Sequence, residues 1–366
     1  MDFSEVKNLI DKSMVEYSIP CSDIAIVHNG EIVFRYWNGT SDDEKKIPLK
    51  GDELYFLYSA TKPITCTAAL QLYEKGKIAL DDKLADYIPE FKDMWVKTPN
   101  GLKKAQNMIT IKHLFTMTSG LNYKLLSKSI QEQIFRKPGS GTLEMVRAMA
   151  GEPLEFEPGE HFLYSLSHDV LAAVVELAAD MSFGEYLKKN IFDVCGMERT
   201  GFALNDEIRS QICSQYCYDA LEDNVSLMEK KNPFILTSRY QSGGAGLISC
   251  VDDYMRYETH MLNGSLLKRK TMDLMRKNHL TSQALTDFRA FKRGYCYGLG
   301  VRTAADSTCV NQGEFGWDGA AASYVLMDPE YHLGIFYATH VRRHSVLYEK
   351  LHPAIRDAVY KEIRRK

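Results

Sequence analysis

The chain has 366 residues, of which 45% are hydrophobic and 25% charged, and its formal net charge at pH 7 is −3. These proportions are ordinary for a globular protein with a full hydrophobic core, in one large domain or two closely packed ones. A slightly acidic chain offers no general attraction to a nucleic acid or an acidic membrane, so we expect neither as a partner. No run of apolar residues is long enough to span a bilayer.

The amino terminus and the cysteines together indicate the compartment. Residues 1–14 form an amphipathic pattern with acids and lack the basic region and apolar core of a signal peptide. We therefore expect a cytoplasmic protein. No Cys-x-x-Cys pair occurs, and in a large chain without an export signal the thiols are expected to be reduced and mostly buried. The eight cysteines are Cys21, Cys66, Cys195, Cys213, Cys217, Cys250, Cys296 and Cys309.

The first predicted elements are a helix and a hairpin. Residues 3–17 place their apolar side chains on one side of a helix. Two β-rich runs then flank His28-Asn29-Gly30, and Asn-Gly is the strongest short hairpin signal. The chain therefore begins with a helix that precedes an antiparallel pair of strands.

The middle of the chain is predicted to be largely helical. Residues 92–107 are polar, contain Pro99-Asn100-Gly101, and are interpreted as an exposed loop. Residues 122–156 are expected to be partly helical and to cover a cleft, whereas residues 202–240 show poor periodicity. Helices are expected after Ser59 to about residue 76, within 80–88, and at 110–120, 168–180, 183–193 and from 251 onward.

The carboxy-terminal part returns to strands and ends in a helix. Strands are expected at 295–301, 323–327 and 333–339, and apolar residues at steps of four predict a helix over 347–363. We therefore predict an α+β fold (an α/β sandwich), with an antiparallel sheet covered by the two terminal helices beside a mainly helical lobe. One domain over 1–366 is expected, with sublobes 1–57 plus 290–366 and 58–289. Alternating βαβ units are absent, which argues against Rossmann and TIM-barrel folds.

The most informative stretch is residues 54–76, which leads from an apolar aromatic run through Ser59-Ala60-Thr61-Lys62 into a helix. Pro63 has no N–H to donate and is tolerated only in a first helical turn, so Ser59 lies at or just before the helix start. Unpaired N–H groups and the helix dipole favour a developing anion there. Lys62 lies about one turn further on the same face. A hydroxyl and an amine so placed can act as nucleophile and proton acceptor, provided that burial favours the neutral amine.

The Ser-x-x-Lys spacing alone is weak, because it occurs three times in this chain. Ser4/Lys7 lies on the amphipathic terminal helix, and Ser265/Lys268 follows a turn and enters a basic stretch. We interpret both of these pairs as a capping serine with a solvated lysine. Only Ser59 combines an apolar approach, a forced helix start and a helix whose residues are apolar enough to be buried.

Several segments in a fixed order carry a family resemblance. LYSATKPIT, around Ser59, resembles the nucleophile motif of penicillin-recognising serine hydrolases. Further segments are similar to those of the branch that contains class C β-lactamases, D-aminopeptidases and family VIII carboxylesterases, and together they cover most of residues 20–340. These segments are ITIKHLFTMTSGL at 109–121, FEPGEHFLYSLSHDVLAAVVE at 156–176, SGGAGLIS at 242–249 and FGWDGAAASYVLMDPE at 315–330.

The resemblance implies a role for each matching residue. Ser59 matches the acylated nucleophile, Lys62 the lysine that helps to deprotonate it, and Tyr164 the tyrosine that shuttles a proton to the leaving group. Gly319 and Ala320 match the strand segment whose backbone, with the Ser59 N–H, forms the oxyanion hole. Acyl transfer needs such preorganised donors and a base that can return its proton.

The departures from the family pattern bear on the substrate. Leu166 stands where class C β-lactamases carry asparagine, and Trp317-Asp318 replaces the cation and threonine that receive a substrate carboxylate. We interpret Trp317 as a pocket wall, and we expect Asp318, if ionised and facing the cleft, to repel a carboxylate. His168 either caps the following helix or lines the pocket. Without the other motifs, Tyr164 would be interpreted as a buried structural tyrosine.

Other kinds of site have little support. His340 and His344 are four apart but lack the glutamate of His-Glu-x-x-His, so neither a metal nor another cofactor is expected. Gly-x-Ser-x-Gly is absent, which argues against an α/β-hydrolase.

The sequence therefore predicts a serine hydrolase of the β-lactamase-related superfamily that cleaves a small-molecule acyl substrate, most readily an ester, through an acyl-enzyme. A peptidase, amidase or β-lactamase, an acyltransferase with the same motifs, and a catalytically silent binding protein remain as alternatives. Retention of Ser59, Lys62 and Tyr164 argues against the silent protein.

Overall fold

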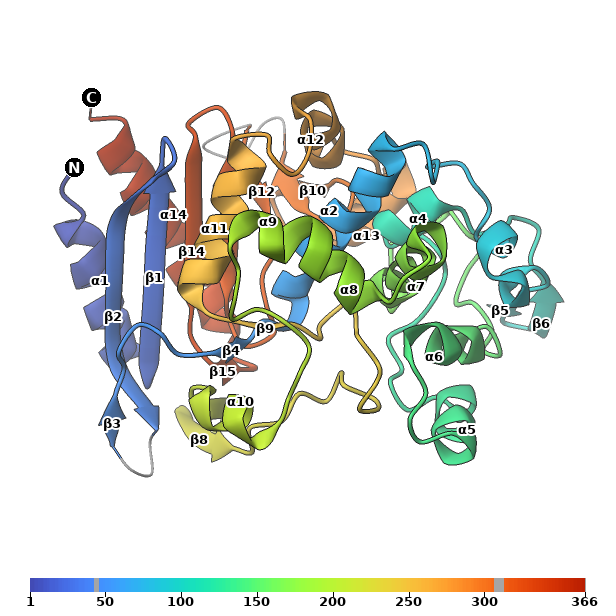
Figure 1. Ribbon diagram of the computed structural model, residues 1–366, viewed down its shortest axis with the longest axis horizontal. Coiled ribbons are helices and arrows are strands. Elements are labelled where there is room, and N and C mark those ends of the chain that lie inside the picture. The colour runs from blue at the N-terminus through green and yellow to red at the C-terminus, as the bar shows by residue number, and fades with distance from the viewer. Residues whose placement is uncertain (43–45, 306–312, 366) are drawn as a thin grey trace.

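An antiparallel sheet of eight strands organises the fold (Figure 1). The computed structural model describes residues 1–42, 46–305 and 313–365. The strand order is β10-β11-β12-β13-β14-β1-β2-β3, so the first and last long strands of the chain pair with each other. The predicted α+β class with an antiparallel sheet is confirmed. The strands are β1 (Cys21–His28), β2 (Glu31–Asp42), β3 (Ile47–Pro48), β10 (Tyr295–Tyr297), β11 (Arg302–Ala304), β12 (Phe315–Gly316), β13 (Tyr324–Asp328) and β14 (Leu333–Ala338).

Alternating side chains along β1 divide the hydrophobic core between the two faces of the sheet. Ile24 and Ile26 pack into one cluster, whereas Ala25 and Val27 belong to the larger cluster on the opposite face. The terminal helices α1 (Ser4–Glu16) and α14 (His352–Ile363) lie against each other and cover the first face, as predicted. Figure 1 shows both chain ends on this side of the molecule.

Helices cover the other face and extend into a mainly helical region. Helix α11 (Val251–Leu262) packs on β1 and β14, and α2 (Thr61–Glu74) packs on α7 (Ser167–Ala179). Every residue of α2 from Thr61 to Leu72 is buried, so this helix forms the centre of the larger core. The remaining helices are α3 (Leu84–Tyr87), α4 (Ile111–Phe115), α5 (Lys128–Arg136), α6 (Thr142–Met149), α8 (Phe183–Leu187), α9 (Asp193–Cys195), α10 (Asp206–Gln211), α12 (Arg269–Arg276) and α13 (Ser282–Phe291), with the shorter or π-helical segments η1 (Tyr58–Ala60), η2 (Pro89–Phe91), η3 (Lys188–Phe192) and η4 (Leu347–Leu351).

Two sequence interpretations of local structure were wrong. Residues 92–107 contain a hairpin rather than a plain loop, because a two-residue turn at Pro99-Asn100 joins two short strands, the second of which begins at Gly101 with φ of 114°. The strand expected over 295–301 ends early, because Gly298 and Gly300 form a turn before β11. The smaller sheets are β5 (Trp95–Thr98) with β6 (Gly101–Lys104), β4 (Tyr55–Phe56) with β9 (Ile248–Ser249), and β15 (Val341–Arg342) with β7 (Gln215–Asp219) and β8 (Asn224–Met228).

The described cysteines and helices bear on two further features of the chain, its thiols and its membrane-spanning potential. All seven described cysteines are free thiols, and only Cys217 is partly exposed, as predicted. Cys309 lies outside the described residues. Among the helices of the described ranges, none combines the length and apolar character that crossing a membrane requires.

Glu258 of α11 gives the fold a pH dependence that can be measured. Its side chain is fully buried, and neither carboxyl oxygen has a hydrogen-bond partner in the described ranges. Burial therefore raises its pKa well above the ordinary value despite the opposing charge of Arg302. The native state then keeps a proton that the unfolded chain releases above about pH 4.5. The contribution of Glu258 to stability is therefore fully present below that pH, and we predict that this contribution declines by up to about 1.4 kcal/mol per pH unit above it.

Glu258→Gln should remove this contribution. Denaturant unfolding of both proteins at several values between about pH 5 and 7 measures it, because the advantage of the wild type over the variant should shrink as the pH rises. Equal pH slopes for the two proteins would contradict the prediction.

Candidate active site

The backbone around Tyr58 places Ser59 at the start of α2. The chain enters through β4, which pairs with β9, and turns at Tyr58, a non-glycine residue with φ of 47°. Such a conformation is strained for a bulky residue and needs surrounding contacts to hold it. The Tyr58 hydroxyl donates to Gln215, and its ring packs edge-on against Phe234 at 5.9 Å. Ser59 therefore lies in η1, just before α2, as predicted.

Lys62 lies beside Ser59 in the fully buried first turn of α2. Its Nζ is 3.2 Å from the Ser59 Oγ and donates a hydrogen bond of 2.7 Å to the Gly244 carbonyl. It also lies 4.6 Å from the centroid of the Tyr164 ring. Among the described residues no carboxylate lies within ion-pair distance of it. The amine is therefore directed at the serine rather than neutralised by an acid.

The glycine-rich segment 242–249 reaches Lys62 because Gly244 has no side chain. A Cβ at Gly244 would lie 2.5 Å from Oδ2 of Asp169, so only glycine allows this backbone to approach. Asp169 in turn fixes the segment from the core, accepting hydrogen bonds from the Tyr240 hydroxyl at 2.7 Å and the Ser242 hydroxyl at 2.6 Å. The carbonyl that holds Lys62 is thus positioned by a buried carboxylate.

Tyr164 completes a triangle of polar groups with Ser59 and Lys62. Its hydroxyl donates to the Ser59 Oγ at 2.7 Å and accepts a hydrogen bond from the Trp317 indole at 3.1 Å. Its ring stacks on Tyr123 with centroids 5.4 Å apart and an interplanar angle of 3°, and on Phe291 at 5.4 Å and 20°. The structure thus brings the three predicted catalytic residues together, and their roles remain predictions.

The turn between β12 and β13 lies close to the serine. A Cβ at Gly319 would be 2.5 Å from the Leu57 carbonyl, two residues before Ser59. The Gly319 N–H already donates to Ser323, whereas the Ala320 and Ser59 amides have no hydrogen-bond partner within the described part of the chain. The predicted oxyanion hole is therefore narrowed to the amides of Ser59 and Ala320, and it stays a prediction.

The condition under which Asp318 would repel a carboxylate is not met, because two cations pair with its carboxylate. Its Oδ1 accepts from Arg302 at 2.8 Å and its Oδ2 from Lys292. Burial would raise the Asp318 pKa, but these two cations outweigh burial and hold the pKa well below its ordinary value. Burial, followed by the Arg302 charge, lowers the pKa of Lys292, which Asp318 partly restores. The cluster carries two positive charges and one negative charge when ionised, so it would not repel a carboxylate.

His168 and Leu166 do not line the catalytic triangle. His168 is fully buried in α7, where its Nε2 meets the Phe115 carbonyl at 3.2 Å and lies 3.7 Å from the Cys66 Sγ. Burial lowers its pKa to about 3, so it is neutral. It neither caps the helix nor faces the Ser59 hydroxyl, because its ring packs between α2 and α4.

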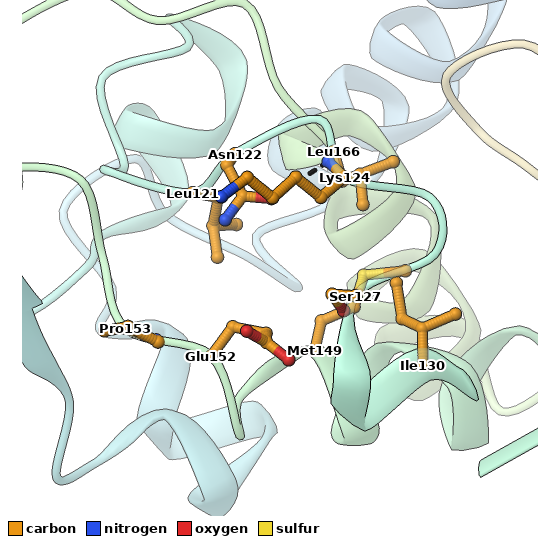
Figure 2. A pocket seen from close by; sticks show the side chains of 9 residues that line it. All are labelled: Leu121, Asn122, Lys124, Ser127, Ile130, Met149, Glu152, Pro153 and Leu166. Carbon is orange, nitrogen blue, oxygen red and sulfur yellow. Dashed lines mark hydrogen bonds between the residues drawn. The ribbon is translucent and has the colours of Figure 1, made fainter. Parts of the chain in front are cut away.

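Leu166 packs into the core beside a small cavity of about 20 Å³, which Figure 2 shows between residues 121–124 and the side chains of Ser127 and Glu152. None of the three catalytic candidates lines that cavity. The predicted contact of Leu166 with substrate therefore has no support in the geometry, because its side chain is 4% exposed and packed against apolar neighbours.

Sequence reasoning missed the neighbours that arrive from distant segments. Tyr123 lies two residues after the end of the signature segment 109–121, and its position close to that segment could have identified it. Lys292 and Arg302 reach Asp318 from positions 26 and 16 residues away and give no local signal. Trp317 is buried beside Tyr164, with ring centroids 5.7 Å apart, and its role as a pocket wall stays a prediction.

Metal ligands do not cluster in the described part of the chain. Within it, no three histidine, cysteine, aspartate or glutamate side chains gather closely enough to hold an ion. The expectation of metal-free chemistry stays a prediction.

Comparison with known proteins identifies the family. The sequence model of the Beta-lactamase family matches residues 6–360. Esterase EstB of Burkholderia gladioli is 29% identical over 375 residues, covering 96% of this chain and 93% of that protein. Lovastatin esterase of Penicillium rubens is 28% identical over 297 residues, and the match covers 77% of this chain and 73% of that protein.

The fold agrees with this assignment. The solved structure of EstCE1, a hydrolase with promiscuous acyltransferase activity, superposes with a TM-score of 0.82 over 98% of both chains at 24% identity. This likeness shows the β-lactamase/DD-peptidase-like fold that the resemblance implied. The family match and the esterase-named relatives support serine-hydrolase or acyl-transfer chemistry. With the family sequence model matching nearly its whole length, this chain belongs to the Beta-lactamase family.

Proposed function

We propose that the chain is a serine esterase that cleaves small acyl esters through an acyl-enzyme on Ser59. The observation that carries the proposal is the position of the Ser59 hydroxyl, which lies between the Lys62 amine and the Tyr164 hydroxyl. The amides of Ser59 and Ala320, which have no hydrogen-bond partner among the residues that the structure describes, provide donors for a developing oxyanion. Nucleophile, proton carriers and oxyanion donors are the three parts that acyl transfer needs.

Acylation follows from these contacts. The Ser59 Oγ attacks the acyl carbon, and its proton passes to Lys62 or Tyr164 as the new C–O bond forms. The negative charge on the carbonyl oxygen is stabilised by the two amides. The bond to the leaving alcohol then breaks, and Tyr164 returns the proton to that oxygen. Water repeats these steps on the acyl-enzyme and releases the acid.

An ester is the preferred substrate class for two reasons. The two curated relatives compared above are named as esterases. The rings of Tyr123, Trp317 and Phe291 surround the catalytic tyrosine, and such aromatic walls favour apolar acyl or alcohol groups. The paired Asp318 adds no repulsion for anionic substrates, so selectivity should come from the aromatic walls.

Acyl transfer to an alcohol is the second candidate. Phe291 stacks on Tyr164 yet is 55% exposed, which offers an apolar surface to an organic acceptor that competes with water. The structural neighbour EstCE1 is described as a hydrolase with promiscuous acyltransferase activity. Both reactions would use the same acyl-enzyme.

Removing the nucleophile tests the proposal. Ser59→Ala should abolish hydrolysis of a p-nitrophenyl ester and leave the protein folded, because a small change at a helix start costs about 1 kcal/mol. Steady-state rates and thermal unfolding measure the two effects. Ser4→Ala and Ser265→Ala are matched controls, since they alter the same Ser-x-x-Lys spacing at exposed positions and should retain activity. A Ser59→Ala protein with most of its activity would refute the assignment.

The proton path can be tested through Tyr164. Tyr164→Phe keeps the stacked ring but removes the hydroxyl, so acylation should slow by about 100-fold or more. Lys62→Ala should have an effect of similar size, and the double variant should lose little beyond either one because the residues act as a unit. Single-turnover kinetics with an activated ester measure the rate.

Tyr123→Phe is the matched control for this experiment. It preserves the other ring of the stack, and its hydroxyl makes no hydrogen bond among the described residues. Near-normal acylation by Tyr164→Phe, or an equal loss in Tyr123→Phe, would return Tyr164 to a structural role.

Because Asp318 is held in two ion pairs, we predict that it stabilises the fold and does not select substrates by their charge. Asp318→Asn leaves Lys292 and Arg302 without their shared carboxylate, and breaking a buried pair costs about 3–5 kcal/mol. We expect a large fall in thermal stability and no selective gain in nitrocefin hydrolysis over a p-nitrophenyl ester. Asp93→Asn removes an exposed ion pair with Lys104 and should change stability little. Normal stability with a specific rise in nitrocefin turnover would instead place the Asp318 charge in the cleft.

A further inference from the structure

Two thiols from distant parts of the chain face each other in the core. The Sγ of Cys213 donates a hydrogen bond to the Sγ of Cys21 across 3.5 Å. Both side chains are fully buried, and Thr339 and the Thr40 carbonyl are their other polar neighbours. Among the described cysteines, no other pair makes such a contact. The arrangement therefore differs from that of an isolated buried thiol.

The two thiols belong to segments that support the approach to the active site. Cys21 is the first residue of β1, in the centre of the large sheet. Cys213 follows α10, and its backbone is fixed by a hydrogen bond from its N–H to the Leu54 carbonyl at 2.9 Å and by His340, which donates to the Cys213 carbonyl at 3.0 Å. Leu54 precedes β4, the strand that leads to Ser59. A bond between the thiols would join the sheet to this segment.

We propose that Cys21 and Cys213 form an intramolecular disulfide when the protein meets a low-molecular-weight disulfide oxidant such as oxidised glutathione. The sulfur atoms are at van der Waals contact and need to approach by about 1.5 Å to reach bonding distance. Both side chains must move to close this distance, while the backbone of Cys213 is held by its hydrogen bonds to Leu54 and His340. The bond would fasten residue 213 to β1 and restrict the unfolded chain.

The reaction balances as two thiol–disulfide exchanges. One cysteine loses its proton and attacks a sulfur of oxidised glutathione, which forms a mixed disulfide and releases one reduced glutathione. The second cysteine then loses its proton and attacks the protein sulfur of that mixed disulfide, which releases the second glutathione. Two S–H bonds are lost, one S–S bond forms, and the oxidant is reduced to two thiols.

The surroundings of Cys21 and Cys213 predict that their oxidation is slow. The hydrogen bond to Cys21, followed by burial, raises the pKa of Cys213, so little thiolate is present at neutral pH. The first exchange also requires a local opening that admits the oxidant. Oxidation should therefore accelerate at alkaline pH and in denaturant below the unfolding transition.

Mass spectrometry of the intact, folded protein tests the proposal. After incubation with oxidised glutathione, we expect the loss of two hydrogen atoms, and a non-reducing digest should contain one linked pair of peptides carrying residues 21 and 213. Reduction should restore the original mass. The oxidised protein should also unfold at a temperature higher by roughly 5 °C or more, because a long loop is closed.

Three variants make the result specific. Cys21→Ser and Cys213→Ala should each abolish the two-hydrogen loss, whereas Cys195→Ser, which removes a buried thiol with no facing partner, should retain it. The non-reducing digest of the wild type identifies the linked cysteines directly, even if a variant fails to fold. Absence of the two-hydrogen loss, a stable glutathione adduct in its place, or a linkage through any other cysteine, including Cys309, would overturn the proposal.

Discussion

The burial of Lys62, which has no carboxylate partner among the described residues, is the constraint on which the arrangement of the site depends. A buried amine is costly unless polar groups surround it. Here these groups are the Gly244 carbonyl, the Ser59 hydroxyl and the faces of two tyrosine rings. Each of these partners sits on a different segment, so the position of one amine ties α2 to the glycine-rich segment and to the residues that precede α7.

A second group of contacts fixes the turn that carries Ala320. The Tyr348 hydroxyl donates to the Gly319 carbonyl and accepts from the Ala322 N–H. Asp318, at the start of the same turn, is held by two cations, and His352 contacts the Ala322 carbonyl at 3.1 Å. These side chains come from the residue that follows α13, from the sheet and from the carboxy-terminal helical segments. A donor positioned in this way is preorganised for a charge that appears only during the reaction.

The features that sequence predicted are those set by residues close together in the chain. Pro63 limited where α2 could begin, and Asn29-Gly30 specified the turn between the first two strands. The order of the motifs was enough to associate Ser59, Lys62 and Tyr164, although they come from different elements. Residues 92–107 were misinterpreted because their polarity was given more weight than the turn residues Pro99-Asn100, which join β5 to β6.

The features that sequence did not predict depend on distant partners. The charge of Asp318 could not be assigned without knowing that Lys292 and Arg302 converge on it. His168 was placed near substrate because it follows the tyrosine motif, but helical geometry turns its ring into the contact between α2 and α4. In both cases the sequence indicated the residue type but not the direction in which the side chain points.

The central claim is that Ser59 is the activated nucleophile, and covalent labelling measures it most directly. The folded protein should react with a fluorophosphonate probe to form a single adduct, and peptide mapping should place that adduct on Ser59. The Ser59→Ala protein, tested in parallel and shown to be folded, should remain unlabelled. Failure of the wild type to react, or an adduct on another residue, would contradict the account.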